Sequence, residues 1–200
     1  MRGFNVQDFK STIESKGGLL RNNRFLVSIP APRKLVSPLG KDERAMELFC
    51  KSTPLPGIGI LTQDVYRYGY GPIERMPYGT VFNDAMLEFY VDSSGMVRKW
   101  FRQWVTLITN PSMPEGIKSK SRTTGNQAYE FAYKEDYQVD IRITAFNSEG
   151  QPAINVILCA AYPNYIGETH QNWDDKNSNM ITSVSFTYRD WYEEFPTTRL

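Results

Sequence analysis

Catalysis by acid–base or nucleophilic chemistry would depend on His170, because it is the one histidine in the sequence. A Ser-His-Asp or Cys-His system needs that imidazole beside a nucleophile. Residues 168–172 are polar and lack the strand-turn-helix context that presents such a nucleophile. Acidic pairs such as Glu135-Asp136 are adjacent in sequence, so their side chains diverge on a strand and do not meet at one substrate. We therefore expect no catalytic residues and no enzymatic activity.

The metal-ligating residues are too few and too far apart for a site. One histidine with Cys50 and Cys159 cannot supply the four ligands of a closed zinc site. Residues 175–179 resemble the start of a calcium-binding loop, but Met180 stands where that loop has its turn glycine and Phe186 where it has its bidentate glutamate. We interpret this stretch as a solvated turn. We expect buried free thiols at both cysteines, and neither a metal nor a cofactor.

The overall charge gives no bulk reason for the protein to bind nucleic acid or an anionic membrane. The chain has 23 Lys and Arg against 22 Asp and Glu, a net charge of +1. The basic run at 118–122 lacks the interleaved aromatic side chains that stack on single strands, so it indicates a solvated loop or a subunit contact. No apolar run approaches the roughly 20 residues that span a bilayer, and residues 1–5 lack an apolar signal segment. We expect no membrane contact, and assembly in a cytoplasm.

Two segments have helical periodicity. Residues 94–109 form the stronger one, with Ser93-Ser94 as the N-cap and Asn110-Pro111 as the end. Its apolar stripe favours core packing over a cofactor-binding surface, and consists of Val97, Trp100, Phe101, Trp104, Val105 and Ile108. Residues 6–16 predict a shorter amphipathic helix that Gly17-Gly18 ends. That helix would be marginal alone, so it needs its own domain or a neighbour to dock on.

Strand patterns cover much of the remaining chain. Alternating or β-branched runs fall at residues 24–29, 48–51, 86–91, 137–145, 154–162 and 181–188. They predict a mainly β fold, an antiparallel sandwich or barrel of about seven strands with helix 94–109 packed on it and a short N-terminal helix. We expect a single domain over 1–200, with an N-terminal helical arm at 1–20 and loop insertions at 31–46 and 111–127.

Three sets of residues suggest contacts beyond the subunit. Tyrosines interrupted by glycines between residues 58 and 77 predict a long twisted ribbon, which is marginal as an isolated hairpin; its contact candidates are Tyr66, Tyr68, Tyr70 and Gly71. Strand 137–145 has one dry face and one wet face, and the wet face consists of Gln138, Asp140, Arg142 and Thr144. Ile157 and Cys159 are apolar at exposed positions of the next strand, so we expect another chain to cover them.

Five short segments also follow one another in a characteristic order. They are FCKSTPLPG at 49–57, Phe82-Asn83-Asp84, the pair Phe101 and Trp104, AYPNYIGE at 161–168, and Trp173-Asp174 followed by 181–191. In that order they resemble the CKA-x-LP strand and turn, the TF-D turn, the Phe-x-x-Trp helix face, the xxPxxVGE loop and the terminal W-D…Y-x-x-W pattern of contractile-phage tail tube proteins. The resemblance covers about residues 23–193.

The resemblance implies a structural subunit that assembles as stacked hexameric rings, with hairpins from each copy closing an inner barrel. It implies that double-stranded DNA passes through without sequence specificity. It also implies three other partners besides further copies of the chain, namely the tail sheath, baseplate and tape measure proteins, and a location in the virion. The wet face of strand 137–145 is then the candidate lumen lining, because DNA slides best where dense Lys and Arg are absent.

Two alternatives stay open. Within the same class, the chain could be a baseplate-proximal tube initiator or the tube protein of a secretion injector. In a different class, a monomeric carbohydrate-binding β-sandwich would stack sugar rings on exposed aromatic side chains, here Tyr66, Tyr68, Tyr70 and Tyr78. A tube protein polymerises, an initiator adds a limited ring, and a binding module stays monomeric at high concentration.

Overall fold

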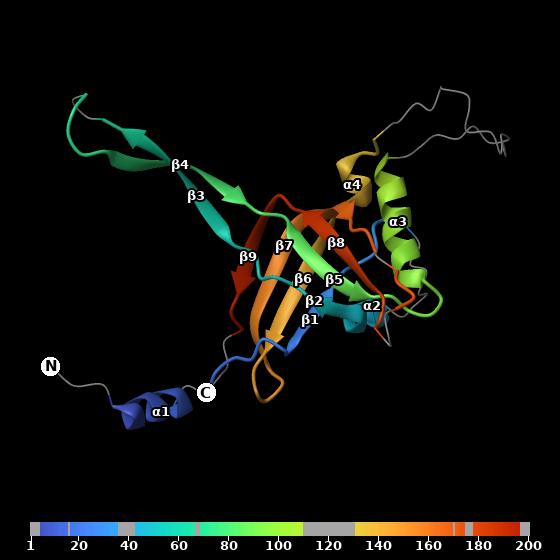
Figure 1. Cartoon of the computed structure of the whole chain (residues 1–200), viewed down its shortest axis with the longest axis horizontal. Coiled ribbons are helices and arrows are strands. Elements are labelled where there is room, and N and C mark those ends of the chain that lie inside the picture. Colours follow the sequence, from blue (N-terminus) through green and yellow to red (C-terminus); the bar gives the residue numbers. More distant parts are fainter. Residues whose placement is uncertain are drawn as a thin grey trace.

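The computed structural model describes residues 5–15, 17–35, 43–66, 69–109, 131–169, 171–174 and 178–196. The predictions for Tyr68, for His170, for the loops 111–127 and 175–177 and for the basic run at 118–122 fall outside these residues. Figure 1 shows a body of strands with helices at its side, from which a two-stranded ribbon and helix α1 (Val6–Ser15) project.

The body is one antiparallel sheet of seven strands in the described part of the chain. Its strands run in the order β1 (Phe25–Ser28), β6 (Val139–Phe146), β7 (Pro152–Ile166), β8 (Ile181–Thr187), β5 (Ala85–Tyr90) and β2 (Cys50–Ser52), and β9 (Asp190–Glu194) also pairs with β7. The predicted mainly β fold with about seven strands is therefore confirmed. The ribbon, β3 (Ile58–Val65) with β4 (Glu74–Phe82), is a separate two-stranded sheet.

Strand β7 belongs to both halves of the sheet. Its first part pairs with β6 and β9, and residues from Tyr162 onward pair with β8. We call β1, β6, β9 and the first part of β7 half A, and β8, β5, β2 and the second part of β7 half B. Between them Ala160 has a positive φ of 53°, which is uncommon for a residue with a side chain, and its N–H donates to Asp140 Oδ1 at 2.9 Å. This irregularity bends β7 and turns the two halves toward one core.

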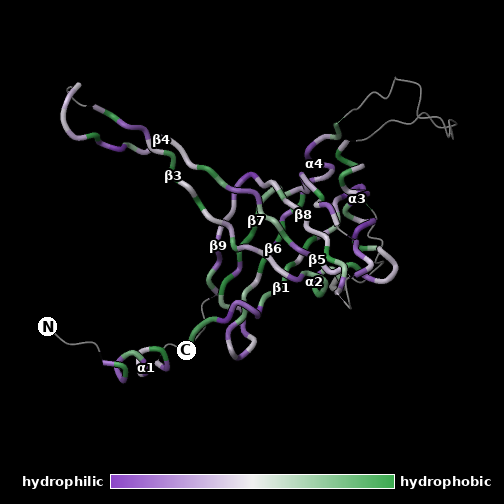
Figure 2. The backbone as a smooth tube through the Cα atoms, in the orientation of Figure 1, coloured by the Kyte–Doolittle hydropathy of each residue, from purple (hydrophilic) through white to green (hydrophobic). Residues whose placement is uncertain are grey.

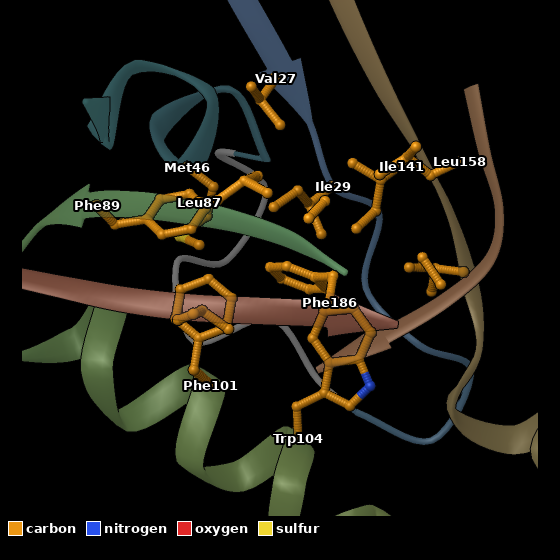
Figure 3. Close-up of a cluster of buried hydrophobic side chains, with 14 of the residues drawn as sticks. Val27, Ile29, Met46, Leu87, Phe89, Phe101, Trp104, Ile141, Leu158 and Phe186 are labelled. Atoms are coloured by element: carbon orange, nitrogen blue, oxygen red, sulfur yellow. The ribbon is translucent and has the colours of Figure 1, made fainter. Parts of the chain in front are cut away.

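Helix α3 (Met96–Thr109) contributes the largest side chains of that core. Figure 3 shows Phe101 and Trp104 rising from the helix toward Phe186 of β8. The ring of Phe186 lies 6.1 Å from Phe101 and 5.9 Å from Trp104, and Phe101 lies 4.9 Å from Phe89. The indole N–H of Trp104 donates to the Tyr137 carbonyl at 2.9 Å. The predicted stripe is buried except for Val105, which is half-buried.

The start of α3 differs from the prediction. The helix begins at Met96, and Asp92 rather than Ser93 or Ser94 accepts a hydrogen bond from a free N–H of its first turn. Asp92 Oδ1 accepts from the Val97 N–H at 3.1 Å, and Oδ2 accepts from the backbone and hydroxyl of Ser94. Hydrogen bonds hold the pKa of Asp92 below its usual value. The bond from the Ser94 hydroxyl contributes most, and those from backbone N–H groups contribute less. Gly95 lets the chain turn so that the Asp92 side chain meets the Val97 N–H, because its φ of +68° is a conformation that favours glycine.

Two short helices were not predicted. Helix α2 (Glu43–Phe49) replaces the end of the expected 31–46 loop and the start of the expected strand at 48–51. The loop interpretation is wrong there because Met46 is buried in the core, 4% exposed, with Phe49 packed against the same core one turn later. Helix α4 (Lys134–Tyr137) precedes β6, so Tyr137 and Gln138 lie before that strand rather than in it.

Truncating the helix–sheet contact should measure how much the core depends on it. We expect Trp104→Ala to lower the free energy of unfolding by about 3–5 kcal/mol, since a fully buried indole leaves a large cavity. The matched control Val105→Ala, on the same helix but half-buried, should lower it by about 1 kcal/mol. Urea unfolding followed by fluorescence and circular dichroism gives both values. Equal effects would mean that α3 does not anchor the core.

Candidate assembly surfaces

Half A presents one polar face, and cross-strand register defines it. One row consists of Ser28, Arg142, Ile157 and Tyr192, and the next of Leu26, Thr144, Asn155 and Glu194. Residues directly opposite on paired strands point to the same side of a sheet. The alternate residues Ile141, Ile143 and Val156 are fully buried in the core. The dry face and the wet face predicted for this segment are thus both present.

The four lumen candidates do not lie equally on this face. Asp140 and Arg142 are exposed and Thr144 is half-buried, all on β6. Gln138 is half-buried and ends helix α4, where its N–H donates to the Lys134 carbonyl at 3.0 Å. None of the four is buried inside the subunit, which would have excluded them. Their role in a lumen remains a prediction.

The exposed position predicted for Ile157 is wrong, whereas its contact with another chain remains a prediction. Ile157 is 4% exposed in the single subunit, flanked by Arg142 on β6 and Tyr192 on β9. Strand β9, which was not predicted as a strand, supplies the missing cover. Cys159 is half-buried opposite Asp190 of the same strand, so it also has a neighbour within its own chain.

The described charged side chains on this face are mostly acidic. Arg142 is the one cation on the strands that form it, against the carboxylates of Asp140, Asp190 and Glu194. Asp190 also lies 3.4 Å from the guanidinium of Arg189. The described strands of half A therefore lack a dense Lys and Arg array that would hold phosphates.

Both cysteines are free and half-buried. Burial raises the pKa of Cys50 to about 12, although its thiol also donates to the Ser52 carbonyl at 3.6 Å. Burial, and then its hydrogen bond with Asp190, raises the pKa of Cys159 to about 11. Both thiols are therefore protonated near neutral pH, so neither can act as a ready nucleophile.

The ribbon carries most of the exposed apolar surface outside the body. Figure 2 shows hydrophobic stretches along it, and the exposed large residues are Ile58, Ile60, Leu61, Tyr66, Tyr70, Ile73, Met76, Tyr78 and Val81. The register shifts after Leu61, where Tyr78 has no partner, as expected for a bulge. Gly59 lies close to Val81, since a Cβ there would lie 2.8 Å from Val81 Cγ1 and would force that side chain to shift. Such a surface on a two-stranded ribbon indicates a contact with another molecule.

The ribbon tip contains the predicted contact residues. Tyr66 and Tyr70 are 55% and 83% exposed. Gly69 and Gly71 have φ values of +73° and +99°, which only glycine adopts without strain, so they shape the turn between β3 and β4. Tyr70 and Gly71 are available to a partner, and their role in a contact remains a prediction.

Other kinds of site are not found in the described residues. That part of the chain holds no group of three or more His, Cys, Asp or Glu side chains that could bind a metal ion. Among its helices, none is both long enough and apolar enough to span a bilayer.

A bent antiparallel sheet with an open polar face and a projecting ribbon defines the class, a mainly β protein with surfaces left open for contacts. The phage tail tube protein family matches residues 20–194, so the chain belongs to this family and is a structural subunit of a tail tube. No curated protein sequence matches the chain.

Solved structures with the same fold come from contractile particles. A chain of the anti-feeding prophage baseplate has a TM-score of 0.55 at 12% identity, covering 89% of this chain and 97% of that one. A chain of the sheath–tube complex of an extracellular contractile injection system has a TM-score of 0.55 at 14% identity, covering 97% and 100%. A chain of its sheath/tube terminator has a TM-score of 0.54 at 15% identity, covering 88% and 96%. At these identities the likeness is one of fold.

Thiol reactivity tests the environment of the two cysteines. At about pH 8 we expect a disulfide reagent to modify the folded protein at least about 100-fold more slowly than the urea-unfolded chain, whose thiols return to a pKa of about 8.5. The reason is that pKa values of about 12 and about 11 leave very little thiolate. Stopped-flow absorbance at both conditions gives the ratio. Rapid modification of the folded protein would contradict the burial of both thiols.

Proposed function

We propose that this chain forms hexameric rings that stack into the DNA-conducting tube of a contractile tail. The observation that carries the proposal is half A, which has a polar face, an apolar face on the core, and two open edges at β1 and β9. Unpaired strand edges are sites of further pairing. A ring in which β1 of one copy pairs with β9 of the next removes both edges and makes a continuous barrel.

Strand direction is compatible with that closure. β1, β6, β7 and β9 alternate in direction, since each pairs antiparallel with the next. An even number of alternating strands lets the next copy begin with the direction that keeps the ladder antiparallel. Any number of copies can therefore join without a parallel mismatch, and the hexameric count comes from the family resemblance.

The polar face of half A would line the lumen. It carries Arg142 with three carboxylates, so passing DNA meets weak repulsion rather than tight binding. Helix α3 lies on the core side of the barrel wall, and it would be outside the tube, toward a sheath. No catalytic step or cofactor is part of this function.

The projecting elements would make contacts between copies and with other tail proteins. The ribbon has exposed apolar side chains, with Tyr66, Tyr70 and Gly71 at its tip. Helix α1 has no buried residue and exposes Val6 and Phe9, so it would add contacts between rings or with the sheath. Sheath, baseplate and tape measure proteins are the proposed partners, in a virion assembled in the host cytoplasm.

A second candidate is a tube initiator or a tube terminator. It is supported by the likeness to chains of a baseplate and of a sheath/tube terminator as well as of a sheath–tube complex. The same features also suit the tube of a secretion injector. The monomeric sugar-binding alternative rests on Tyr66, Tyr70 and Tyr78, which are exposed on the ribbon.

Electron microscopy of the purified chain over a concentration series tests the proposal. We expect hollow tubes above a critical concentration. Removing residues 1–18 should leave the fold intact, because no residue of α1 is buried, and should raise that concentration. Isolated rings or short stacks would favour the initiator or terminator. Monomers at every concentration, even with baseplates as seeds, would exclude the tube.

Reagent size can show which surface lines the lumen. In a Cys50→Ala, Cys159→Ala background, Thr144→Cys should react with a polyethylene-glycol maleimide as a monomer and at least about tenfold more slowly in the tube. N-ethylmaleimide should still react, since a lumen contains water. The control Gln103→Cys, on the exposed face of α3, should react with both reagents in both states. Equal reaction of the large reagent at both positions in tubes would contradict the assignment.

A further inference from the structure

The ribbon joins the body through residues 53–57, between β2 and β3, and through a shorter two-residue link, Asn83-Asp84, between β4 and β5. Both carboxylate oxygens of Asp84 are occupied. Oδ2 accepts from the side-chain amide of Asn164 at 2.7 Å, and Oδ1 accepts from the Thr187 hydroxyl at 2.8 Å. The Tyr188 hydroxyl donates to the Asn83 carbonyl at 2.7 Å. We call these five residues the ribbon bracket.

The bracket holds the link to two other strands at once. Asn164 lies in the second part of β7, and Thr187 is the last residue of β8, with Tyr188 directly after it. The ring of Tyr188 also lies 6.2 Å from Phe82, the last residue of β4. Figure 1 shows β4 running from the projecting ribbon into β5 at this place. At the shorter of the two connections, the direction in which the ribbon leaves the body is therefore constrained by hydrogen bonds to both neighbouring strands.

A small change at the link becomes a large displacement at the tip. β4 has nine residues, so the ribbon reaches about 30 Å from the link at about 3.3 Å per residue. A swing of about 15° would move the tip by roughly 8 Å, more than the spacing of about 4.8 Å between neighbouring strands. β3 and β4 form a separate two-stranded sheet and pair with no strand of the body. Pairing with the body therefore does not oppose such a swing.

We propose that Asp84 is a positioning residue for assembly, which fixes the ribbon in the direction that its contact with another copy requires. This rests on the proposed function, in which the ribbon contacts a second copy. Asp84 is exposed, so the loss of its hydrogen bonds leaves no buried charge unpaired and should cost the body little stability. These hydrogen bonds favour assembly instead, because a ribbon already held in the right direction loses less conformational freedom when each copy joins.

A purely structural role for Asp84 makes a different prediction. If Asp84 only stabilised the end of β8 through its bond with Thr187, its loss would lower the free energy of unfolding. The range of ribbon directions would not change. The bracket predicts the reverse, a nearly unchanged unfolding midpoint and a wider range of directions. The two readings are separated by a measurement of ribbon direction in the unassembled chain.

Spin labels at Tyr70→Cys on the ribbon tip and Gln103→Cys on α3 report that direction, in a Cys50→Ala, Cys159→Ala background at a concentration below assembly. Pulsed electron resonance should give a narrow distance distribution for the parent. With Asp84→Ala the distribution should become at least about twice as broad. The control Asp64→Ala removes the partner of Arg75, 3.5 Å away within the ribbon and remote from the link, and should leave it narrow.

An exchange of partners gives a rescue. Asn164→Asp alone places two carboxylates together and should broaden the distribution. Asp84→Asn combined with Asn164→Asp should narrow it again, because the amide introduced at position 84 donates to the carboxylate introduced at position 164 and its oxygen still accepts from Thr187. Rescue by this charge-conserving exchange identifies the hydrogen bond itself as the cause.

The same variants without labels are then tested in assembly. Asp84→Ala should raise the critical concentration for tube formation by about tenfold, and the exchanged pair should restore it. A distribution that stays narrow in Asp84→Ala overturns the bracket. Broadening with an unchanged critical concentration overturns its role in assembly. If the parent never assembles although Asp84→Ala broadens the distribution, the proposed function fails, and with it the role in assembly, while the bracket itself is retained.

Discussion

The fold depends on one strand that pairs with different partners along its two parts. β7 pairs with β6 and β9 along its first part and with β8 along its second, and it can do both only because the chain bends between Cys159 and Tyr162. At the bend, Asp140 accepts the N–H of Ala160, which would otherwise lose its ladder partner. The bend lets the inward side chains of both halves share one core that α3 completes. A straight β7 would leave two sheets, each with an uncovered apolar face.

The bend also decides which surfaces are left for other molecules. Half B is flanked by the ribbon link and α3, whereas half A keeps an open polar face and unpaired outer edges at β1 and β9. The shared core therefore stabilises the subunit, while the strand edges at β1 and β9 that can still form hydrogen bonds with another molecule lie on half A. The ribbon and α1 follow the same division, since neither contributes a fully buried side chain to the core. Assembly can then use these surfaces without competing with folding.

Sequence patterns predicted the elements whose periodicity is strong and local. The alternation of Ile141 and Ile143 with Asp140 and Arg142, and the stripe on α3, each reflect one face on a core, so the pattern identified the buried side correctly. The sequence did not indicate α2, because its burial depends on Met46 meeting strands that lie far along the chain. Nor did it indicate β9, whose five residues include three charged ones and form a strand because β7 offers an open edge.

For the candidate surfaces, the sequence indicated which side of a strand is polar. It did not indicate which residues on that side are covered by other parts of the same chain. Ile157 was expected to be free for another chain because it is apolar at a position of the strand that should be exposed, yet an unpredicted strand of the same chain flanks it. The Asp84 bracket was not visible for a related reason, since its partners lie 80 and 103 positions away. Local spacing reports which side of an element is dry, but only the folded sheet decides what lies against it. A ribbon aimed by such distant partners is directed by the completed core, so a copy whose body has not folded could not present the ribbon in the right direction to the next copy.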